Sequence, residues 1–561
     1  MHVVSAANPL LRLDLGALDW VIIAIYFIIV VGIGVAARRS VATSEDFFLA
    51  GRALPAWVTG LAFISANLGA IEVLGMAANG AQYGTSTVHF YWIGAVPAMV
   101  FLGVVMMPFY YSSRVHSVPE YMRRRFNSSS HLLNGLSFAL AQVLTAGVNL
   151  YALAVVIEAL IGWPQWLAII VSAALVLAYI TLGGLSGAVY NEVLQFFVII
   201  AGLIPIVVVG LYRAGGWSGV QEKVNNPAFF STWGGTQVGH WTNPLGDWIG
   251  IVFGLGFALS FGYWTTNFAE VQRALAAKDL SSAQRTPLIG AFPKIFIPAL
   301  TIIPGLIALA LIPSFKQPGA NYNYAIPNLM RILLPTGVLG IALTGLLAAF
   351  MAGMAANVSG FNTVFTYDVW RAYVVRGRED GYYLAVGRIV TVIGVIAGIG
   401  TAFYAARFSN IMNYIQSLFS YFNAPLFAVF ILALYWRRAS PWAGVWGQLA
   451  GIAAAFAFHY IGPNINYFHA GQTASGEVNL QMVNFYGAIA AVVVAWVVMV
   501  VVTSFTPAKP EQELVGLVSG LPDPHGPDVE AAKQVQVWWK RPVVLGAIAL
   551  GITLILSIIF R

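Results

Sequence analysis

The sequence predicts an all-α polytopic membrane protein, and three observations support this fold class. Of the 561 residues, 59% are apolar and only 9% are charged, and the mean hydropathy is +0.78. Soluble globular domains are about a quarter charged, so they are excluded. Apolar segments of about 20 residues, long enough to cross a bilayer as helices, recur along the chain. Two of them are interrupted by glycine and polar residues, which lipid tolerates only where the backbone lines a protein cavity.

Hydropathy predicts about fourteen transmembrane helices, each a long apolar segment bounded by polar or charged residues. They are expected at 18–36, 54–80, 89–110, 132–161, 164–182, 188–212, 246–272, 287–313, 335–366, 383–406, 410–436, 443–462, 482–504 and 543–560.

The basic residues of the loops predict the orientation in the lipid bilayer. One set of loops carries nineteen Lys and Arg residues, whereas the opposite set, both termini included, carries seven. The positive-inside rule places the richer set in the cytoplasm and both termini outside it, multi-pass in a cell membrane. Arg-rich inner loops suit a bacterial inner membrane. The net charge of +7 then reflects these loops and does not indicate nucleic-acid binding.

The spans group into seven expected units. They are 1–53 (outside N-terminus, first helix and cytoplasmic loop), 54–212 (first five-helix repeat), 213–245 (outside loop), 246–436 (second repeat), 437–504 (two accessory helices), 505–541 (cytoplasmic linker) and 542–561 (last helix). The linker is rich in Pro, Glu and Asp and is expected to be a flexible connector. The outside loops 214–245 and 314–334 are expected to form short lids over an entrance.

An acidic residue beside a helix interruption marks the first candidate binding site. Residues 65–72 (SANLGAIE) interrupt the second span and place Glu72 inside it. An intramembrane carboxylate is costly unless it faces a cavity, so Glu72 predicts a binding site. The seventh span weakens at Ser260-Phe261-Gly262, five helices later. This spacing matches two inverted five-helix repeats of a secondary transporter, with solute held between the breaks. The alternative is that each glycine marks a tight packing contact.

Several motifs then resemble those of the sodium/solute symporter family, in order from about residue 40 to 440. They are residues 44–52 (SEDFFLAGR), 118–122 (VPEYM), 183–185 (GGL), 272–278 (QRALAAK), 365–369 (FTYDV), 413–417 (NYIQS) and 424–430 (APLFAVF). The last two are most similar to the bacterial sodium/glucose (galactose) branch. The resemblance implies a LeuT-like core of two inverted five-helix repeats with broken first helices.

The resemblance also implies site residues. Tyr263 matches an aromatic gate that closes a sugar site toward the cytoplasm, and Asn67 matches its hydrogen-bonding partner. The expected solute-binding residues are Glu72, Ser260, Tyr263, Trp264, Lys294 and Gln416. Amide and charged groups can meet sugar hydroxyls, while aromatic rings cover the apolar ring face. The alternatives are that the aromatics are packing residues and that Lys294 extends toward an interface.

Two departures concern the solute pocket. The branch has glutamine or histidine where this chain has Glu72. On the next helix it has an aromatic-Glu-Trp motif where this chain reads Phe90-Tyr91-Trp92. The acid has therefore moved from one wall of the expected pocket to another. A different polyol, an amino sugar or a cationic solute stays open as the ligand.

A third departure concerns the coupling ion. The family's principal sodium site uses backbone carbonyls, here of Ser65, Leu68 and Ala349, together with two adjacent hydroxyl side chains. The positions of those hydroxyls are Ala352 and Gly353. Hard cations need about six oxygen ligands, so the loss of two leaves a poor cage. Glu192 is expected either to attract a cation leaving toward the cytoplasm or to pair with a loop arginine.

These observations predict a secondary active symporter that moves a small polar solute, a monosaccharide, inward with sodium by alternating access. The alternative is a proton-coupled or uncoupled transporter, with Glu72 or Glu192 carrying the proton. No cofactor is expected apart from Na⁺ as a coupling ion. An enzyme is disfavoured because no HExxH pair, nucleophile elbow or nucleotide-binding loop occurs. A membrane sensor is disfavoured because no signalling domain follows the helices.

Overall fold

The computed structural model describes residues 14–38, 50–112, 115, 117–235, 241–469, 478–521 and 537–560. All regular elements of this part of the chain are helices, and it contains no β-strand. Ten of its helices are long and apolar enough to cross a membrane, and a bent pair at 56–88 makes an eleventh. The predicted all-α membrane fold is therefore confirmed.

Each of the fourteen predicted spans coincides with helical structure, although not every one meets the length and hydropathy of a complete span. The single or continuous helices are α1 (Ala17–Arg38), α8 (Ser128–Ile161), α9 (Gln165–Ala214), α16 (Val338–Val364), α17 (Asp380–Ala405), α20 (Pro441–Ile461), α21 (Leu480–Phe505) and α23 (Pro542–Ile559). The spans built from several pieces are α3 (Ala56–Asn67), η2 (Ile71–Gly75) and α4 (Met76–Tyr83); η4 (Phe90–Ala95), α5 (Val96–Phe101), η5 (Leu102–Met106) and α6 (Met107–Ser112); η7 (Gly250–Ser260), α11 (Phe261–Thr266) and α12 (Phe268–Leu275); α13 (Leu280–Phe296) and α14 (Pro298–Leu311); and α18 (Ile411–Leu418), η11 (Phe419–Asn423) and α19 (Ala424–Tyr435). The three predicted spans outside the ten and the bent pair are the first part of α9, the 250–266 segment and α20.

The boundary expected between two of the spans is not a break in the helix. The segments expected at 164–182 and 188–212 form the continuous helix α9. A glycine weakens a helix by about 1 kcal/mol relative to alanine but does not by itself end it.

The first predicted helix break is present. Helix α3 ends at Asn67, and the helix that resumes at Ile71 is bent from it by 56°. The resumed helix starts with the π-helical segment η2, which holds Glu72. The break therefore sets the direction in which this carboxylate points.

The second break lies later than predicted. The chain stays helical through Ser260 and Gly262 and becomes extended at Asn267, between α11 and α12. Asn267 accepts a hydrogen bond from the backbone N–H of Ala269 at 3.0 Å and so caps α12. Gly262 instead allows a close approach, because a Cβ there would lie 2.9 Å from the carbonyl oxygen of Asn423.

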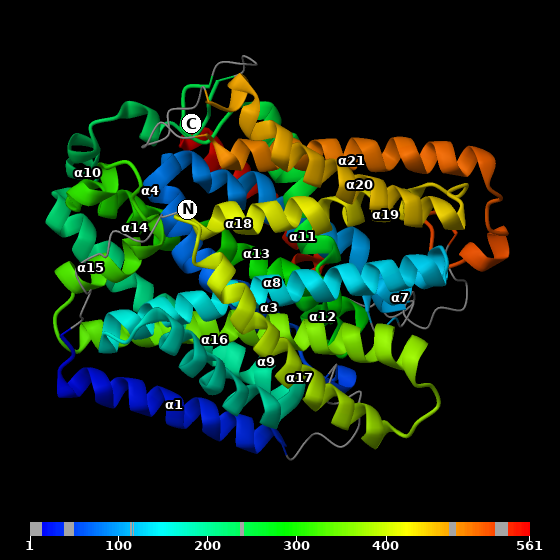
Figure 1. The fold of residues 1–561 in the computed structure, drawn as a ribbon, viewed down its shortest axis with the longest axis horizontal. Helices are drawn as coiled ribbons and strands as arrows, with labels where there is room; N and C mark the ends of the chain where they lie inside the picture. Colours follow the sequence, from blue (N-terminus) through cyan, green and yellow to red (C-terminus); the bar gives the residue numbers. More distant parts are fainter. Residues whose placement is uncertain are drawn as a thin grey trace.

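The helices run mostly along one direction, and the connecting segments gather at the two ends (Figure 1). Helices α10 (Gly216–Val224) and α15 (Ala325–Leu333) lie at one end, whereas α7 (Val118–Arg125) lies at the other. Helix α16 packs against α1, α8 and α9, and α21 packs against α20 on the opposite flank. Helix α3 contacts α13, α16, α9 and α12, so the first break lies inside the bundle.

Two loops that were expected to be lids or connectors are partly docked. In the loop expected to lie outside, the carbonyl oxygen of Phe229 accepts from Thr85 at 3.0 Å, and that of Thr232 contacts His89 Nε2 at 2.9 Å. The first part of the expected linker is packed rather than free: Leu517 accepts a 2.5 Å hydrogen bond from the buried Tyr121 hydroxyl. Buried Leu514 and Val518 explain this docking, since apolar side chains favour burial even in a polar stretch. The linker residues 522–536 lie outside the described residues.

Candidate solute and cation site

A cavity lies at the first helix break, between segments from four spans. Its lining residues are Asn67, Ile71, Glu72, Met76, Phe90, Ala95, Leu259, Ser260, Tyr263, Trp264, Met412, Gln416 and Phe419. Every predicted solute-binding and gate residue except Lys294 is among them. Lys294 reaches the same place through its ammonium group, as described next.

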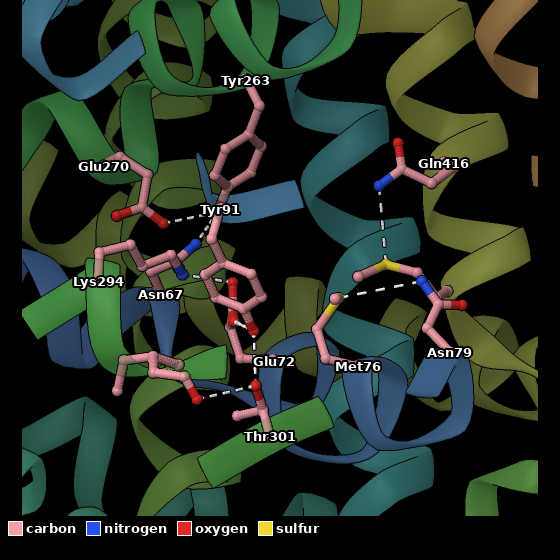
Figure 2. A network of polar contacts seen from close by, with 12 residues as sticks. Asn67, Glu72, Met76, Asn79, Tyr91, Tyr263, Glu270, Lys294, Thr301 and Gln416 are labelled. Atoms are coloured by element: carbon pink, nitrogen blue, oxygen red, sulfur yellow. Dashed lines mark hydrogen bonds and ion pairs between the residues drawn. The ribbon is translucent and has the colours of Figure 1, made fainter. Parts of the chain in front are cut away.

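Glu72 is held at the centre of a buried polar network (Figure 2). Its Oε1 accepts a hydrogen bond from the ammonium group of Lys294, and its Oε2 accepts from the Tyr91 hydroxyl at 2.5 Å. The Lys294 side chain is 1% exposed and that of Glu72 is 11% exposed. Lys294 also donates to Asn67 Oδ1, and its nitrogen lies 5.0 Å from the ring centre of Tyr91. Lys294 is thus an inward-facing partner of the acid and does not extend to an interface.

This network shows how Glu72 is held although the acid was expected on the next helix. Tyr91 stands at the position where the resemblance predicted a glutamate, and its hydroxyl binds the carboxylate of Glu72. The acidic partner of Lys294 comes from the first broken helix. Tyr91 also contacts Thr301 Oγ1 at 2.8 Å. Sequence reasoning noted the Tyr91 position as a departure but did not place Tyr91 or Thr301 in the site.

The predicted gate contact is present on another side of the cavity. Asn67 Nδ2 donates to the Tyr263 hydroxyl at 3.1 Å, and the Tyr263 ring stacks on Phe419 with 4.6 Å between ring centres. The Tyr263 hydroxyl donates in turn to Glu270 Oε1 at 2.7 Å. Glu270 is 2% exposed, and its Oε2 has no hydrogen-bond partner among the described residues. Glu270 was missed, and its place directly after the Asn267 cap is the only sequence signal for it.

Gln416 lines the cavity and carries a buried acceptor, Oε1, without a partner among the described residues. Its Nε2 lies 3.7 Å from the sulfur of Met412, a weak acceptor. A buried polar atom without a partner is costly, so a donor from a bound solute would stabilise it. Ser260 lines the same cavity from the seventh span.

Two of the predicted cation residues, Ala349 and Gly353 on α16, lie against Gly69 at the break of α3. A Cβ on Gly69 would lie 3.1 Å from the Cα of Gly353 and 3.7 Å from the carbonyl oxygen of Ala349. Ser65 is fully buried, and its hydroxyl has no hydrogen-bond partner in the described part of the chain. A buried hydroxyl without a partner is an oxygen available to a cation. Ala352 is buried and supplies no side-chain oxygen there.

Glu192 is paired with an arginine, which is the second of the two roles considered for it. Its carboxylate receives two hydrogen bonds from Arg273, at 2.5 Å from Nη2 and 3.2 Å from Nε. The side chains are 1% and 0% exposed, so the acid does not face an open mouth. The bidentate geometry neutralises both charges inside the protein.

Replacing Glu192 with alanine is therefore expected to destabilise the protein by about 3–5 kcal/mol, because Arg273 would stay buried without its counter-charge. Thermal unfolding of the detergent-solubilised protein measures this loss, and Glu192→Ala/Arg273→Met should recover part of it. A normal unfolding temperature combined with lost sodium dependence would instead support the cation-exit role.

Comparisons with known proteins agree with this geometry. Residues 47–451 match the sodium:solute symporter family. A sodium/glucose cotransporter 4 of Danio rerio is 27% identical over 94% of this chain and 88% of its own length. A sodium/mannose cotransporter of Bos taurus is 30% identical over 78% of each chain, and a sodium/glucose cotransporter of Vibrio parahaemolyticus is 28% identical over 80% of this chain and 86% of its own.

A solved structure confirms the fold. A Na⁺-coupled sialic acid symporter in a substrate-bound outward-open state superposes with a TM-score of 0.71, covering 88% of this chain and 100% of that one, at 20% identity. The LeuT-like arrangement predicted from the motifs is thus shared by a solved transporter. Because the family match spans most of the helical bundle and both broken helices, the chain belongs to the sodium:solute symporter family.

Proposed function

We propose that the protein is a secondary active symporter that carries a small polar solute of the monosaccharide class inward together with sodium. The cavity at the α3 break is the observation that carries this proposal. It combines the Glu72–Lys294 pair and the free amide oxygen of Gln416 with the rings of Tyr263 and Trp264. Such a lining suits a ligand whose hydroxyls both donate and accept and whose ring faces are apolar.

The relatives support the solute class and the ion. Their names specify sodium with glucose or sodium with mannose. The amide and aromatic lining of this cavity is chemically compatible with a hexose, which is why we favour a monosaccharide over an ionic solute.

Polar contacts on both sides of the cavity support alternating access. The Tyr263 hydroxyl is held between Asn67 and Glu270 on one side. On the other side lies an outer amide cluster, which consists of Asn79, Gln82, Asn410, Asn413 and Gln481. Within it, Asn410 Nδ2 donates to Asn79 at 2.9 Å and to Gln82 at 2.8 Å, and Gln481 donates to Asn413 at 2.8 Å. Opening one set of contacts while the other stays closed would expose the cavity to one side at a time.

Uptake of radiolabelled sugars into proteoliposomes at fixed pH tests the proposal. We expect an inward sodium gradient to accelerate uptake, and replacement of sodium by potassium or choline to abolish the acceleration. A thermal-shift screen of sugars and polyols, with and without sodium, identifies the solute. Gln416→Glu should weaken binding of that solute while membrane insertion stays normal. No stabilisation by any sugar would contradict the monosaccharide assignment.

A second candidate is proton-coupled or uncoupled transport, and the missing hydroxyls at Ala352 and Gly353 favour it. Uptake that is insensitive to sodium but follows an imposed pH gradient would establish proton coupling. Uptake insensitive to both gradients would establish a facilitator.

We further propose that the protein lies in a bacterial inner membrane with both termini outside the cytoplasm. The excess of basic residues in one set of loops supports this orientation. Alkaline phosphatase fused after residue 561 should be active, whereas a fluorescent protein at the same site should not fold into its emitting form. The opposite pattern would invert the topology.

A further inference from the structure

Asn149 on α8 reaches into the break of α3. Its Oδ1 accepts a hydrogen bond from the backbone N–H of Ala70 at 3.0 Å, directly after the break, and the side chain is buried. The residue belongs to neither α3 nor α16, the two helices from which the sodium ligands were expected.

The amide oxygen occupies space that two glycines leave open. A Cβ on Gly353 would lie 2.6 Å from Asn149 Oδ1, and a Cβ on Gly69 would lie 2.9 Å from it. Real Cβ atoms do not approach an oxygen so closely, because the contact is strongly repulsive. Asn149 in this position and a serine at position 353 therefore exclude each other. Position 353, where the resemblance predicted a hydroxyl, is therefore next to an oxygen that Asn149 supplies from α8.

The region of the break thus contains two side-chain oxygens, one from Ser65 near the end of α3 and one from Asn149 on α8. The Ser65 hydroxyl is buried without a hydrogen-bond partner among the described residues. The Asn149 oxygen has a second lone pair besides the one that Ala70 uses. With the carbonyls of Ser65, Leu68 and Ala349 they would make five oxygens, close to the number that a hard cation takes.

We propose that Asn149 is a ligand of the coupling cation and replaces the hydroxyl that Gly353 lacks. The inference rests on the proposed sodium coupling and names the residue that completes its site. A neutral amide oxygen and a hydroxyl are hard donors of the kind that sodium prefers over soft ligands.

The test measures sodium binding without transport, by ²²Na⁺ binding and by sodium-induced thermal stabilisation in the absence of solute. Asn149→Leu keeps the branched shape of the side chain and removes the oxygen, so half-saturation should need at least about tenfold more sodium. Asn149→Asp keeps the acceptor for Ala70 and adds a negative charge, so half-saturation should need several-fold less sodium than in the wild type. If Asn149 only capped the break, the aspartate variant would bind sodium like the wild type, and this result would overturn the proposal.

A control and an exchange complete the experiment. Thr145→Val, one turn away on α8, removes a hydroxyl that bonds to the Ala141 carbonyl, and it should leave sodium binding unchanged. Gly353→Ser should lower stability in the wild type but restore sodium binding in Asn149→Ala. A wild-type protein that binds no sodium would overturn the proposed coupling together with this inference. A wild type that binds sodium, with Asn149→Leu equally competent, would overturn the inference alone.

Discussion

Lys294→Ala is expected to abolish solute uptake and to lower the stability of the protein. The substitution leaves the Glu72 carboxylate buried with only the Tyr91 hydroxyl as a partner. Removing one member of a buried ion pair costs about 3–5 kcal/mol, because the remaining charge is not solvated. It also removes a donor that faces both Asn67 and Glu72 beside the cavity. Uptake into proteoliposomes and the thermal unfolding midpoint measure the two effects.

Moving the acid back tests whether pairing with Lys294 is the essential property. Glu72→Gln alone should weaken solute binding by about tenfold or more, equivalent to about 1.4 kcal/mol. Glu72→Gln/Tyr91→Glu places the carboxylate on the neighbouring helix, where the resemblance predicted an acid, and should recover much of the binding. As a comparison, Tyr91→Phe removes the hydrogen bond to Glu72 and keeps the Glu72–Lys294 pair. It should lower the free energy of unfolding by about 0.5–1.5 kcal/mol. A double variant no better than Glu72→Gln would show that the position of the acid, and not its pairing, matters.

Tyr263→Ala is expected to open the cavity on the side of Glu270 and to stop coupled uptake. The change removes the stack on Phe419 and the hydrogen bonds to Asn67 and Glu270. An aromatic pair contributes about 0.5–1.5 kcal/mol and each hydrogen bond a similar amount. Losing about 2–4 kcal/mol of stabilisation of the closed gate is enough to change the ratio of closed to open conformations more than tenfold.

A cysteine reporter measures this opening directly, because the chain contains no cysteine of its own. Ser359 on α16 is partly buried and donates at 3.2 Å to Gln272 of α12, the helix that also carries Glu270, the hydrogen-bond partner of Tyr263. Ser359→Cys should react slowly with a thiol reagent in an otherwise unchanged protein and much faster in Tyr263→Ala. Tyr263→Phe keeps the stack and should give an intermediate rate. Equal rates in all three proteins would show that Tyr263 does not close this path.

Much of the candidate site was predictable because each of its residues belongs to a short motif that can be recognised in the sequence alone. Asn67, Glu72, Ser260, Tyr263, Trp264 and Gln416 were predicted to share a pocket, and the structure brings them to one cavity. Tyr263 and Asn67 were predicted to be partners and are hydrogen-bonded. The roles of these residues in binding and gating stay predictions until the variants are measured.

Other features were not predictable because they depend on which helices meet. The partner of Lys294 is 222 residues away, and Tyr91, Thr301 and Glu270 join the network only through packing. Glu192 left two roles open until Arg273 was found against it, 81 residues away. The second helix break lies at Asn267 because the Asn267 side chain caps α12. Hydropathy does not detect a capping hydrogen bond of this kind.

By itself the sequence determined an all-helical membrane protein with a broken first core helix and a charged residue at the break. Apolar content and segment length decide this, since a chain in lipid must satisfy its backbone hydrogen bonds within helices. The tertiary structure alone decided that Glu72 pairs with Lys294 and that Asn149 fills the space between Gly69 and Gly353. Buried charges and amide oxygens are stabilised by particular partners at short range, and packing of distant helices selects those partners.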